Sequence, residues 1–261
     1  MSLRIVVFVD HEIGYRLLQK LIIHHRNTSI HLVAAVTTTE NGKYWWPGVE
    51  SLCIDNSITL KRYKEPLVFL QEFQDIDWYF LLSWKHILPD TLIKLPKIGV
   101  INLHYSLLPE YRGVYPVNWA IIDGRKKTGV TYHLVNKKVD GGTIISQKSL
   151  QIHLSDTARS LQLRLDYLAF DLFDEVLMKI KTQHWKNDFY IKRPDIFQGS
   201  YKSRKDFLSM NQLDLDRNYN VRDLLNLLRG KTFFPESQNL YIIDTDTGKP
   251  IYISINLYTN E

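Results

Sequence analysis

Short apolar runs that alternate with helix-patterned segments dominate the first hundred residues. Residues 4–9 and 30–37 are almost continuously apolar, and residues 11–25 between them repeat apolar side chains at helical spacing. A run that is apolar throughout is typical of a strand buried on both faces, as in a parallel sheet. The alternation therefore predicts an α/β fold with a Rossmann-like, doubly wound, mostly parallel sheet and helices on both faces.

Later segments continue this alternation. We expect a long loop over 39–57, a helix over 66–73 and a long helix over 155–181 that Ser155 or Asp156 can cap. The remaining strands of the sheet are expected at 58–60, 78–83, 100–103, 130–135 and 144–151.

Beyond about residue 183 the composition becomes more polar and irregular. Expected elements there are a helix over 221–229 and strands over 240–244 and 251–257. We therefore divide the chain into a main domain over 1–185 and a small α+β C-terminal subdomain over 186–261.

Charge and cysteine usage restrict the class of protein. One cysteine, Cys53, excludes an internal disulfide and is consistent with a reducing cytoplasm. The first apolar run is too short to cross a membrane, and the rest of the sequence contains no long apolar segment. We therefore expect a cytoplasmic protein without membrane contact. The formal net charge of +5 does not choose between a solvated surface and attraction of an anionic ligand or a nucleic acid.

Several common catalytic motifs are absent from the sequence. The first strand is followed by residues 10–14 without a G-x-G-x-x-G turn, and the chain has no Walker loop, which disfavours nicotinamide and nucleoside-triphosphate enzymes. His24 and His25 have no partners at metal-ligand spacing, so no metal is expected. No G-x-S-x-G elbow occurs and Cys53 has no nearby His, which leaves covalent catalysis unsupported.

An amide, an imidazole and a carboxylate remain near strand ends. Asn102 and His104 are one residue apart, so on a strand they point to the same side. Both can donate a hydrogen bond to an oxygen that gains negative charge, and Asp140 can orient His104 from a loop loosened by two glycines. Spacing alone leaves open that Asn102 and Asp140 only satisfy turn backbones and that His104 is packed at a strand end.

The amino-acid sequence around these three residues is more specific than their spacing. Residues 102–113, 129–135 and 139–147 closely resemble the formyltransferase family that uses 10-formyltetrahydrofolate. The resemblance implies the formyltransferase fold and a transfer by direct amine attack, with Asn102, His104 and Asp140 as catalytic residues. Tyr105 departs from the family pattern, in which many members carry proline, and we expect no loss of catalysis from this difference.

The same resemblance implies a folate site. The pterin of 10-formyltetrahydrofolate, which is the co-substrate, is expected to enter a cleft between residues 81–88 and the loop 139–142, largely through backbone groups. The cofactor-binding residues implied are Leu81, Leu82, Ile87, Leu88, Val139, Asp140, Gly141 and Gly142.

The acceptor amine distinguishes the branches of this family. A glycinamide ribonucleotide enzyme ends soon after the long helix, and a methionyl-tRNA enzyme carries a larger C-terminal barrel. The tail here resembles enzymes that formylate dTDP-linked 4-amino-4,6-dideoxy sugars, or their 3-amino relatives, for the O-antigen of lipopolysaccharide. We expect dTDP-4-amino-4,6-dideoxy-D-glucose as acceptor, a homodimer and no nucleic-acid partner. Several alternatives stay open. The acceptor can instead be glycinamide ribonucleotide, methionyl-tRNA or a UDP-linked sugar, and the protein can instead be a non-catalytic nucleotide- or RNA-binding protein on the same fold.

A sugar nucleotide needs cationic or amide donors for its pyrophosphate and an aromatic or apolar slot for its base. The substrate-binding residues expected on these grounds are Trp84, Lys85, Tyr111, Arg112, Tyr201 and Lys202. Packing of Trp84, fixing of the loop by Tyr111 and Arg112, and plain surface exposure of the last two are the open alternatives.

Overall fold

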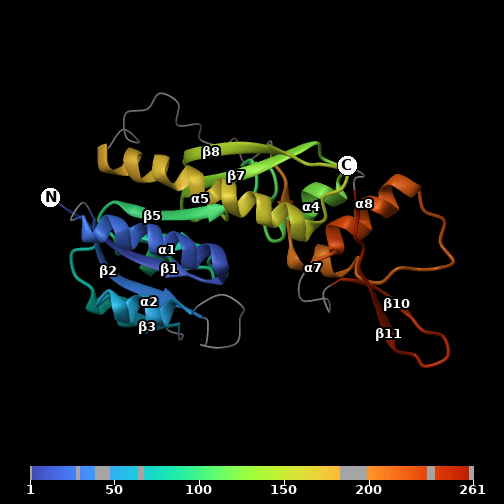
Figure 1. Cartoon of the computed structure of the whole chain (residues 1–261), viewed down its shortest axis with the longest axis horizontal. Helices are drawn as coiled ribbons and strands as arrows, with labels where there is room; N and C mark the ends of the chain where they lie inside the picture. Colours follow the sequence, from blue (N-terminus) through green and yellow to red (C-terminus); the bar gives the residue numbers. More distant parts are fainter. Residues whose placement is uncertain are drawn as a thin grey trace. The chain divides into compact units, whose positions relative to one another are not determined.

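The computed structural model describes residues 2–27, 30–38, 48–63, 68–182, 199–233 and 239–258 (Figure 1). The chain divides into two compact units. Unit 1 comprises Met1–His104, Tyr132–Ser146 and Phe170–Arg193, and unit 2 comprises Tyr105–Thr131, Gln147–Ala169 and Pro194–Glu261. The predicted domain boundary at 185/186 lies outside the described residues.

Seven strands form one sheet in the order β3-β2-β1-β4-β5-β7-β8. Their bounds are β1 Leu3–Val9, β2 Ile30–Thr37, β3 Thr59–Arg62, β4 Trp78–Leu82, β5 Gly99–His104, β7 Lys127–Leu134 and β8 Ile144–Gln151. The pairs β1–β2, β1–β4, β2–β3 and β4–β5 are all parallel. The strand order reverses between β1 and β4, which is where doubly wound sheets bind ligands at their carboxyl ends. The predicted doubly wound, mostly parallel sheet is confirmed.

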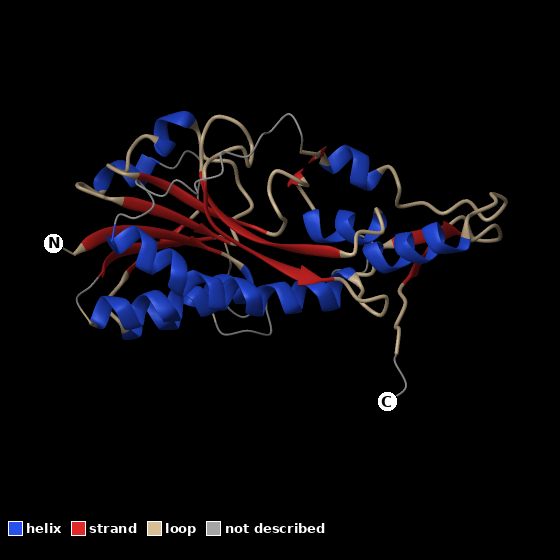
Figure 2. Ribbon diagram, turned by 90° about the horizontal axis from the view of Figure 1, so that it is seen from above, coloured by secondary structure: helices blue, strands red, loops and turns tan. Residues whose placement is uncertain are grey.

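The central strands are buried on both faces. Residues 5–9 of β1 and all of β4 are buried, as their apolar runs predict. Helix α1 (His11–Arg26) turns Leu17, Leu18 and Leu21 into the core, and helices lie on both sides of the sheet in Figure 2. Each Å² of apolar surface removed from water contributes about 25 cal/mol to the free energy of folding, so these buried strands and the packed face of α1 contribute strongly to the stability of unit 1.

Two predicted segments differ from the structure. The expected loop over 39–57 contains helix α2 (Val49–Asp55), while 39–47 lie outside the described residues. The expected helix over 66–73 is described only as a 3₁₀ turn, η1 (Val68–Glu72). A short helix α3 (Asp90–Ile93), which has no counterpart in the prediction, precedes β5.

The long helix α5 (Ala158–Thr182) begins three residues later than predicted. The Asp156 carboxylate accepts from the backbone nitrogen of His153 at 2.7 Å and pairs with Arg164 at 2.5 Å, so it does not cap the helix. Thr157 caps instead, because its Oγ1 accepts from the backbone nitrogen of Ser160 at 3.3 Å.

Unit 2 contains the smaller elements. They are β6 (Arg112–Gly113), α4 (Pro116–Ile122), β9 (Tyr201–Lys202), α7 (Arg204–Leu208), α8 (Val221–Lys231), β10 (Leu240–Ile243) and β11 (Pro250–Ile253). Strands β10 and β11 form an antiparallel hairpin, and α4 packs on α8 through a hydrogen bond from Asn118 Nδ2 to the Gly230 carbonyl at 2.8 Å. The expected small α+β C-terminal part is therefore present. Among the described helices, none combines the length and the hydropathy that a membrane span requires.

Candidate active site

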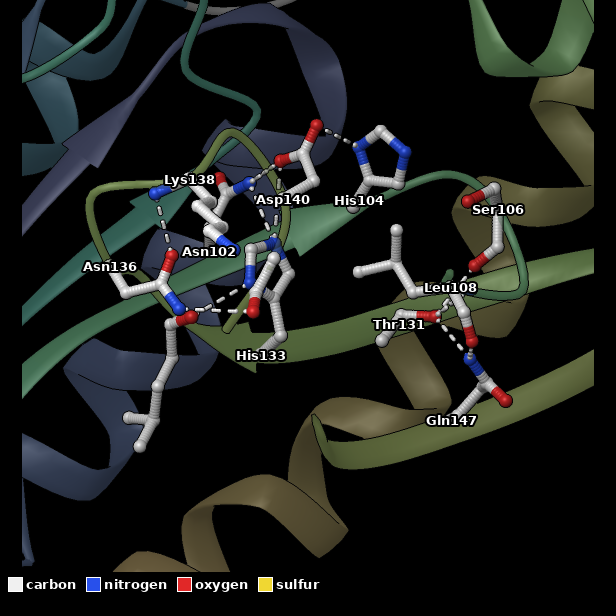
Figure 3. Close-up of polar contacts among 12 residues, drawn as sticks. Asn102, His104, Ser106, Leu108, Thr131, His133, Asn136, Lys138, Asp140 and Gln147 are labelled. Atoms are coloured by element: carbon white, nitrogen blue, oxygen red, sulfur yellow. Dashed lines mark hydrogen bonds and ion pairs between the residues drawn. The ribbon is translucent and has the colours of Figure 1, made fainter. Parts of the chain in front are cut away.

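Asn102 and His104 lie at the carboxyl end of β5 in unit 1. Their side chains share one face of the strand and point towards Asp140, while Leu103 between them is buried (Figure 3). His104 is only 6% exposed. Hydrogen bonds in such a poorly solvated position are electrostatically stronger than in water.

Asp140 projects from a tight turn between β7 and β8. The Gly141 nitrogen donates to the Lys138 carbonyl at 3.0 Å, and Asn136 Nδ2 donates to the Gly141 carbonyl at 3.0 Å. A Cβ atom on Gly142 would lie 1.6 Å from the carbonyl oxygen of Leu134. Gly142 therefore permits close packing of the turn, and the expectation that the glycines loosen this loop is wrong.

The three predicted catalytic residues are brought together at this turn. Asp140 Oδ2 lies 3.6 Å from His104 Nδ1, and Asp140 Oδ1 lies 3.4 Å from Asn102 Nδ2. The cluster holds two hydrogen-bond donors beside one carboxylate. Such a set can stabilise an oxyanion and exchange a proton with a reacting nitrogen.

A fourth polar residue, His133 on β7, completes the cluster. Its Nε2 lies 3.2 Å from Asn102 Nδ2 and 3.5 Å from Asp140 Oδ1, and its Nδ1 lies 2.9 Å from the Leu134 carbonyl (Figure 3). The sequence gives His133 no predicted role. The available signal was a histidine between Tyr132 and Leu134, in the resembling segment 129–135.

The chain that follows His104 is held by polar contacts within unit 2. Thr131 Oγ1 donates to the Ser106 carbonyl at 2.6 Å, and Gln147 Nε2 donates to Thr131 Oγ1 at 2.8 Å and to the Leu108 carbonyl at 3.1 Å (Figure 3). These bonds satisfy backbone groups that the end of β5 leaves unpaired. The loop after the candidate catalytic strand is thus well ordered.

The residues predicted to bind folate fall into two groups, one with buried and one with exposed side chains. Leu81, Leu82 and Leu88 are buried in the core of unit 1, whereas the side chains of Ile87 and Val139 are 82% and 41% exposed. Of these five side chains, only those of Ile87 and Val139 present apolar surface to the solvent. Over the described ranges, no group of three or more His, Cys, Asp and Glu side chains is arranged to hold a metal ion.

Trp84 and Lys85 follow β4 and differ in environment. The Trp84 ring packs edge-on against Phe8 and Tyr63, with centroid distances of 5.1 and 5.3 Å. Lys85 is exposed. Ring packing therefore holds Trp84 in place, although its buried Nε1 has no hydrogen-bond partner, while Lys85 lies at the surface.

The four other predicted substrate residues meet in one place. In the β6–β9 pair, Arg112 lies opposite Tyr201 and Gly113 lies opposite Lys202. Tyr111, next to β6, is buried, and its hydroxyl donates to Asp123 at 3.0 Å.

Tyr111 and Lys202 have internal partners within unit 2. Burial raises the pKa of Tyr111 to about 12. Lys202 Nζ lies 3.4 Å from Asp123 and 4.0 Å from the centre of the Trp119 ring. Tyr111 and Lys202 therefore stabilise the loop, whereas Tyr201 is exposed.

Comparisons with known proteins give the family. Residues 3–177 match the model described as Formyl transferase, and residues 206–259 match the model described as N-formyltransferase dimerization C-terminal domain. The bifunctional polymyxin resistance protein ArnA of Wigglesworthia glossinidia brevipalpis is 30% identical over 246 residues, which cover 88% of this chain and 35% of that protein. A methionyl-tRNA formyltransferase of Staphylococcus aureus is 33% identical over 196 residues, which cover 72% and 57%. The chain thus spans 35–57% of the length of these relatives.

Solved structures share the fold at low identity. A 4-N formyltransferase from Francisella tularensis aligns with a TM-score of 0.80 and 22% identity over 98% of each chain. A sugar N-formyltransferase from a Shewanella species gives 0.77 and 23% over 99% of each chain. An N-formyltransferase from Helicobacter canadensis, in complex with folinic acid and dTDP-3-aminofucose, gives 0.65 and 22% over 89% of this chain and 81% of that one. With a family model matched from residue 3 to residue 177, the chain belongs to the formyl transferase family.

Proposed function

We propose that this protein transfers a formyl group from 10-formyltetrahydrofolate to the amino group of a dTDP-linked amino-dideoxy sugar. The preferred acceptor is dTDP-4-amino-4,6-dideoxy-D-glucose, which makes the reaction a step in O-antigen and lipopolysaccharide biosynthesis. The observation that carries the proposal is the cluster of Asn102, His104 and Asp140, in which the carboxylate lies within 3.6 Å of both donors.

Formyl transfer to an amine requires negative charge to be held on one oxygen. The amine nitrogen bonds to the formyl carbon, the bond from that carbon to N10 of the folate breaks, one proton leaves the amine and one reaches N10. Between these events the former carbonyl oxygen carries the charge. We assign the Asn102 amide and the His104 ring as its donors, and one such donor is typically worth about 10²–10³ in rate.

Asp140 has two tasks in this scheme. Its Oδ2 faces His104 Nδ1 and so orients the imidazole ring, of which we assign Nε2 to the reacting oxygen. The distance of 3.6 Å exceeds that of a hydrogen bond, and such contacts commonly tighten when substrate binds. The same carboxylate can accept the proton from the attacking amine, directly or through a water molecule.

The folate supplies the formyl group and leaves with a proton on N10. Exposed Ile87 and Val139 are suited to an apolar contact with its pterin, and we keep Leu81, Leu82, Leu88, Gly141 and Gly142 as the residues whose backbone would meet the polar edge of that ring. Asp140 directly follows Val139 in the sequence and belongs to the same unit as Ile87. The residues present therefore fit a folate co-substrate.

The acceptor rests on chemistry and on the related proteins. Within unit 1, exposed Lys85 at the end of β4 is suited to a pyrophosphate, and Trp84 beside it stays a candidate. Within unit 2, exposed Tyr201 is suited to a nucleobase, and Tyr111, Arg112 and Lys202 stay candidates for substrate binding. The Francisella and Helicobacter proteins, described as a 4-N formyltransferase and as a complex with dTDP-3-aminofucose, support a sugar amine.

Methionyl-tRNA is the second candidate acceptor, because several relatives at 33% identity are methionyl-tRNA formyltransferases. The described tail carries a two-stranded hairpin, β10–β11, within the stretch that matches the N-formyltransferase dimerization C-terminal domain, which favours the sugar branch. Transfer to methionyl-tRNA would also weaken steeply with salt, since phosphate contacts release counterions.

The deciding experiment is an acceptor panel. Purified protein and 10-formyltetrahydrofolate are incubated with dTDP-4-amino, dTDP-3-amino and UDP-4-amino sugars, glycinamide ribonucleotide and methionyl-tRNA, and formylated products are measured by mass spectrometry. We expect turnover of the dTDP-4-amino sugar above all others. Turnover of either non-sugar acceptor alone would move the protein to another branch, and no turnover with any of them would leave a non-catalytic binding protein.

We further propose a homodimer, a cytoplasmic location and the two-domain division at 185/186. The match to a dimerization domain supports the dimer, as do the exposed apolar side chains Ile251 and Tyr252 on the β10–β11 hairpin. Sedimentation should therefore give twice the chain mass of 30.8 kDa. A Tyr252→Lys variant should shift that equilibrium to monomer, whereas unchanged mass would place the interface elsewhere.

A further inference from the structure

We infer that His133 is a positioning residue that holds the Asn102 side-chain amide with its nitrogen towards the reacting oxygen. The inference rests on the proposed formyl transfer, since it assigns a partner to one of the two oxyanion donors. His133 lies on β7 with its side chain within unit 1, and it is 1% exposed.

The hydrogen bonds of His133 determine which ring nitrogen carries the hydrogen. Nδ1 lies 2.9 Å from the carbonyl oxygen of Leu134, and a carbonyl oxygen can only accept. Nδ1 is therefore the donor. In the neutral ring, Nε2 is then left as an acceptor.

The Asn102 amide faces two acceptors. Its Nδ2 lies 3.2 Å from His133 Nε2 and 3.4 Å from Asp140 Oδ1. A rotated amide would place Oδ1 against a nitrogen lone pair and a carboxylate oxygen, both of which repel it. Together, His133 and Asp140 therefore fix the nitrogen side of the amide inward (Figure 3).

The two contacts are not equivalent for catalysis. One N–H of Asn102 is engaged by His133, and the other meets Asp140 only at 3.4 Å, near the upper limit of a hydrogen bond. A formyl oxygen that enters can replace this longer contact. Without the acceptor on His133 the amide can rotate, and the rotated form presents Oδ1, which repels a developing oxyanion.

Two substitutions separate this role from packing. In His133→Gln, the side-chain Oε1 can reach the former position of Nε2 and still accept from Asn102. His133→Leu keeps a buried side chain of similar size without an acceptor. We expect kcat to fall about 10²-fold in His133→Leu, as for the loss of one oxyanion donor, and to recover by about an order of magnitude in His133→Gln. KM for both substrates should change little.

The same pair of substitutions in an Asn102→Ala background tests whether His133 acts through Asn102. Residues that act as one unit are strongly non-additive, so His133→Leu should cost less than about threefold once the amide is gone. A full loss in both backgrounds would show a packing role and overturn the inference.

An NMR measurement, which needs no catalytic turnover, tests the role of His133 separately from the proposed formyl transfer. The side-chain NH₂ resonances of Asn102, assigned by their absence in Asn102→Ala, should shift and exchange faster in His133→Leu and should persist in His133→Gln. Unchanged resonances in folded His133→Leu would overturn the inference even if formyl transfer is established. If His133→Leu does not fold, His133→Gln decides, because loss of the protected NH₂ signals in that variant would also overturn it.

Discussion

His104 Nδ1 lies 3.6 Å from Oδ2 of Asp140, and both side chains are largely buried. The carboxylate thus faces one ring nitrogen of a buried histidine and fixes the orientation of that ring. Replacing Asp140 by Asn preserves shape and removes the charge. We expect kcat to fall by at least about 10²-fold, since a charged partner of the reacting group is lost.

The measurement for Asp140→Asn is kcat for formyl transfer, with circular dichroism to check folding. Asp55→Asn is the matched control, because Asp55 is exposed at the end of α2. Turnover in Asp140→Asn equal to that of the control would remove Asp140 from the proposed mechanism.

Much of this arrangement follows from local rules, and some of it does not. Side chains alternate between the two faces of a strand, so the sequence predicts that Asn102 and His104 lie on one face of β5. The structure has them on the same face. The role of His133 depends on β5 and β7 being neighbours in the sheet order, which is a non-local property.

The sequence pattern does not predict helix α2, because Pro47 and Gly48 just before it are typical of a loop and the helix itself is short. The internal partners of Tyr111 and Lys202 also lie outside any local pattern. Both depend on Asp123, which is distant in sequence from Lys202.

Substitution of Gly142 tests whether close packing of the turn positions Asp140. A Cβ atom there would lie 1.6 Å from the Leu134 carbonyl, so Gly142→Ala must displace backbone. Overpacking of this kind typically costs about 1–3 kcal/mol, and we expect a lower free energy of unfolding together with reduced kcat because Asp140 moves.

Gly248→Ala serves as the comparison for Gly142→Ala. Gly248 has φ +67° and no atom within 4 Å of a built Cβ, so its substitution introduces backbone strain without crowding. It should cost about 1–2 kcal/mol of stability and leave kcat unchanged. Urea unfolding and steady-state kinetics measure both, and an unchanged kcat in Gly142→Ala would show that the turn tolerates displacement.

Lys231 on α8 should make stability depend on pH. It is 1% exposed, its Nζ donates to the Phe207 carbonyl and to Asn211 Oδ1, each at 2.5 Å, and burial lowers its pKa to about 7. The unfolded chain has the ordinary value of 10.5, so between these values the unfolded state binds the extra proton. The free energy of unfolding should therefore rise with pH from about 7 to 10.5. Lys231→Met should remove this rise.

Urea unfolding of both proteins at pH 6.5, 8 and 9.5 measures the effect, which should be on the order of a few kcal/mol across this window. Parallel pH profiles for the two proteins would show that the hydrogen bonds of Lys231 retain its charge over the whole range.

Lys85 is the cation best placed to bind an anionic substrate after β4, because it is exposed. Hydrogen bonds to charged groups are worth about 1.5–3 kcal/mol, so Lys85→Met should raise KM for the sugar nucleotide by an order of magnitude or more and change kcat little. Lys94→Met is the matched control, since Lys94 is also exposed and lies in the same unit. KM for the folate should be unaffected in both variants, and an unchanged KM for the sugar nucleotide in Lys85→Met would assign the pyrophosphate to other donors.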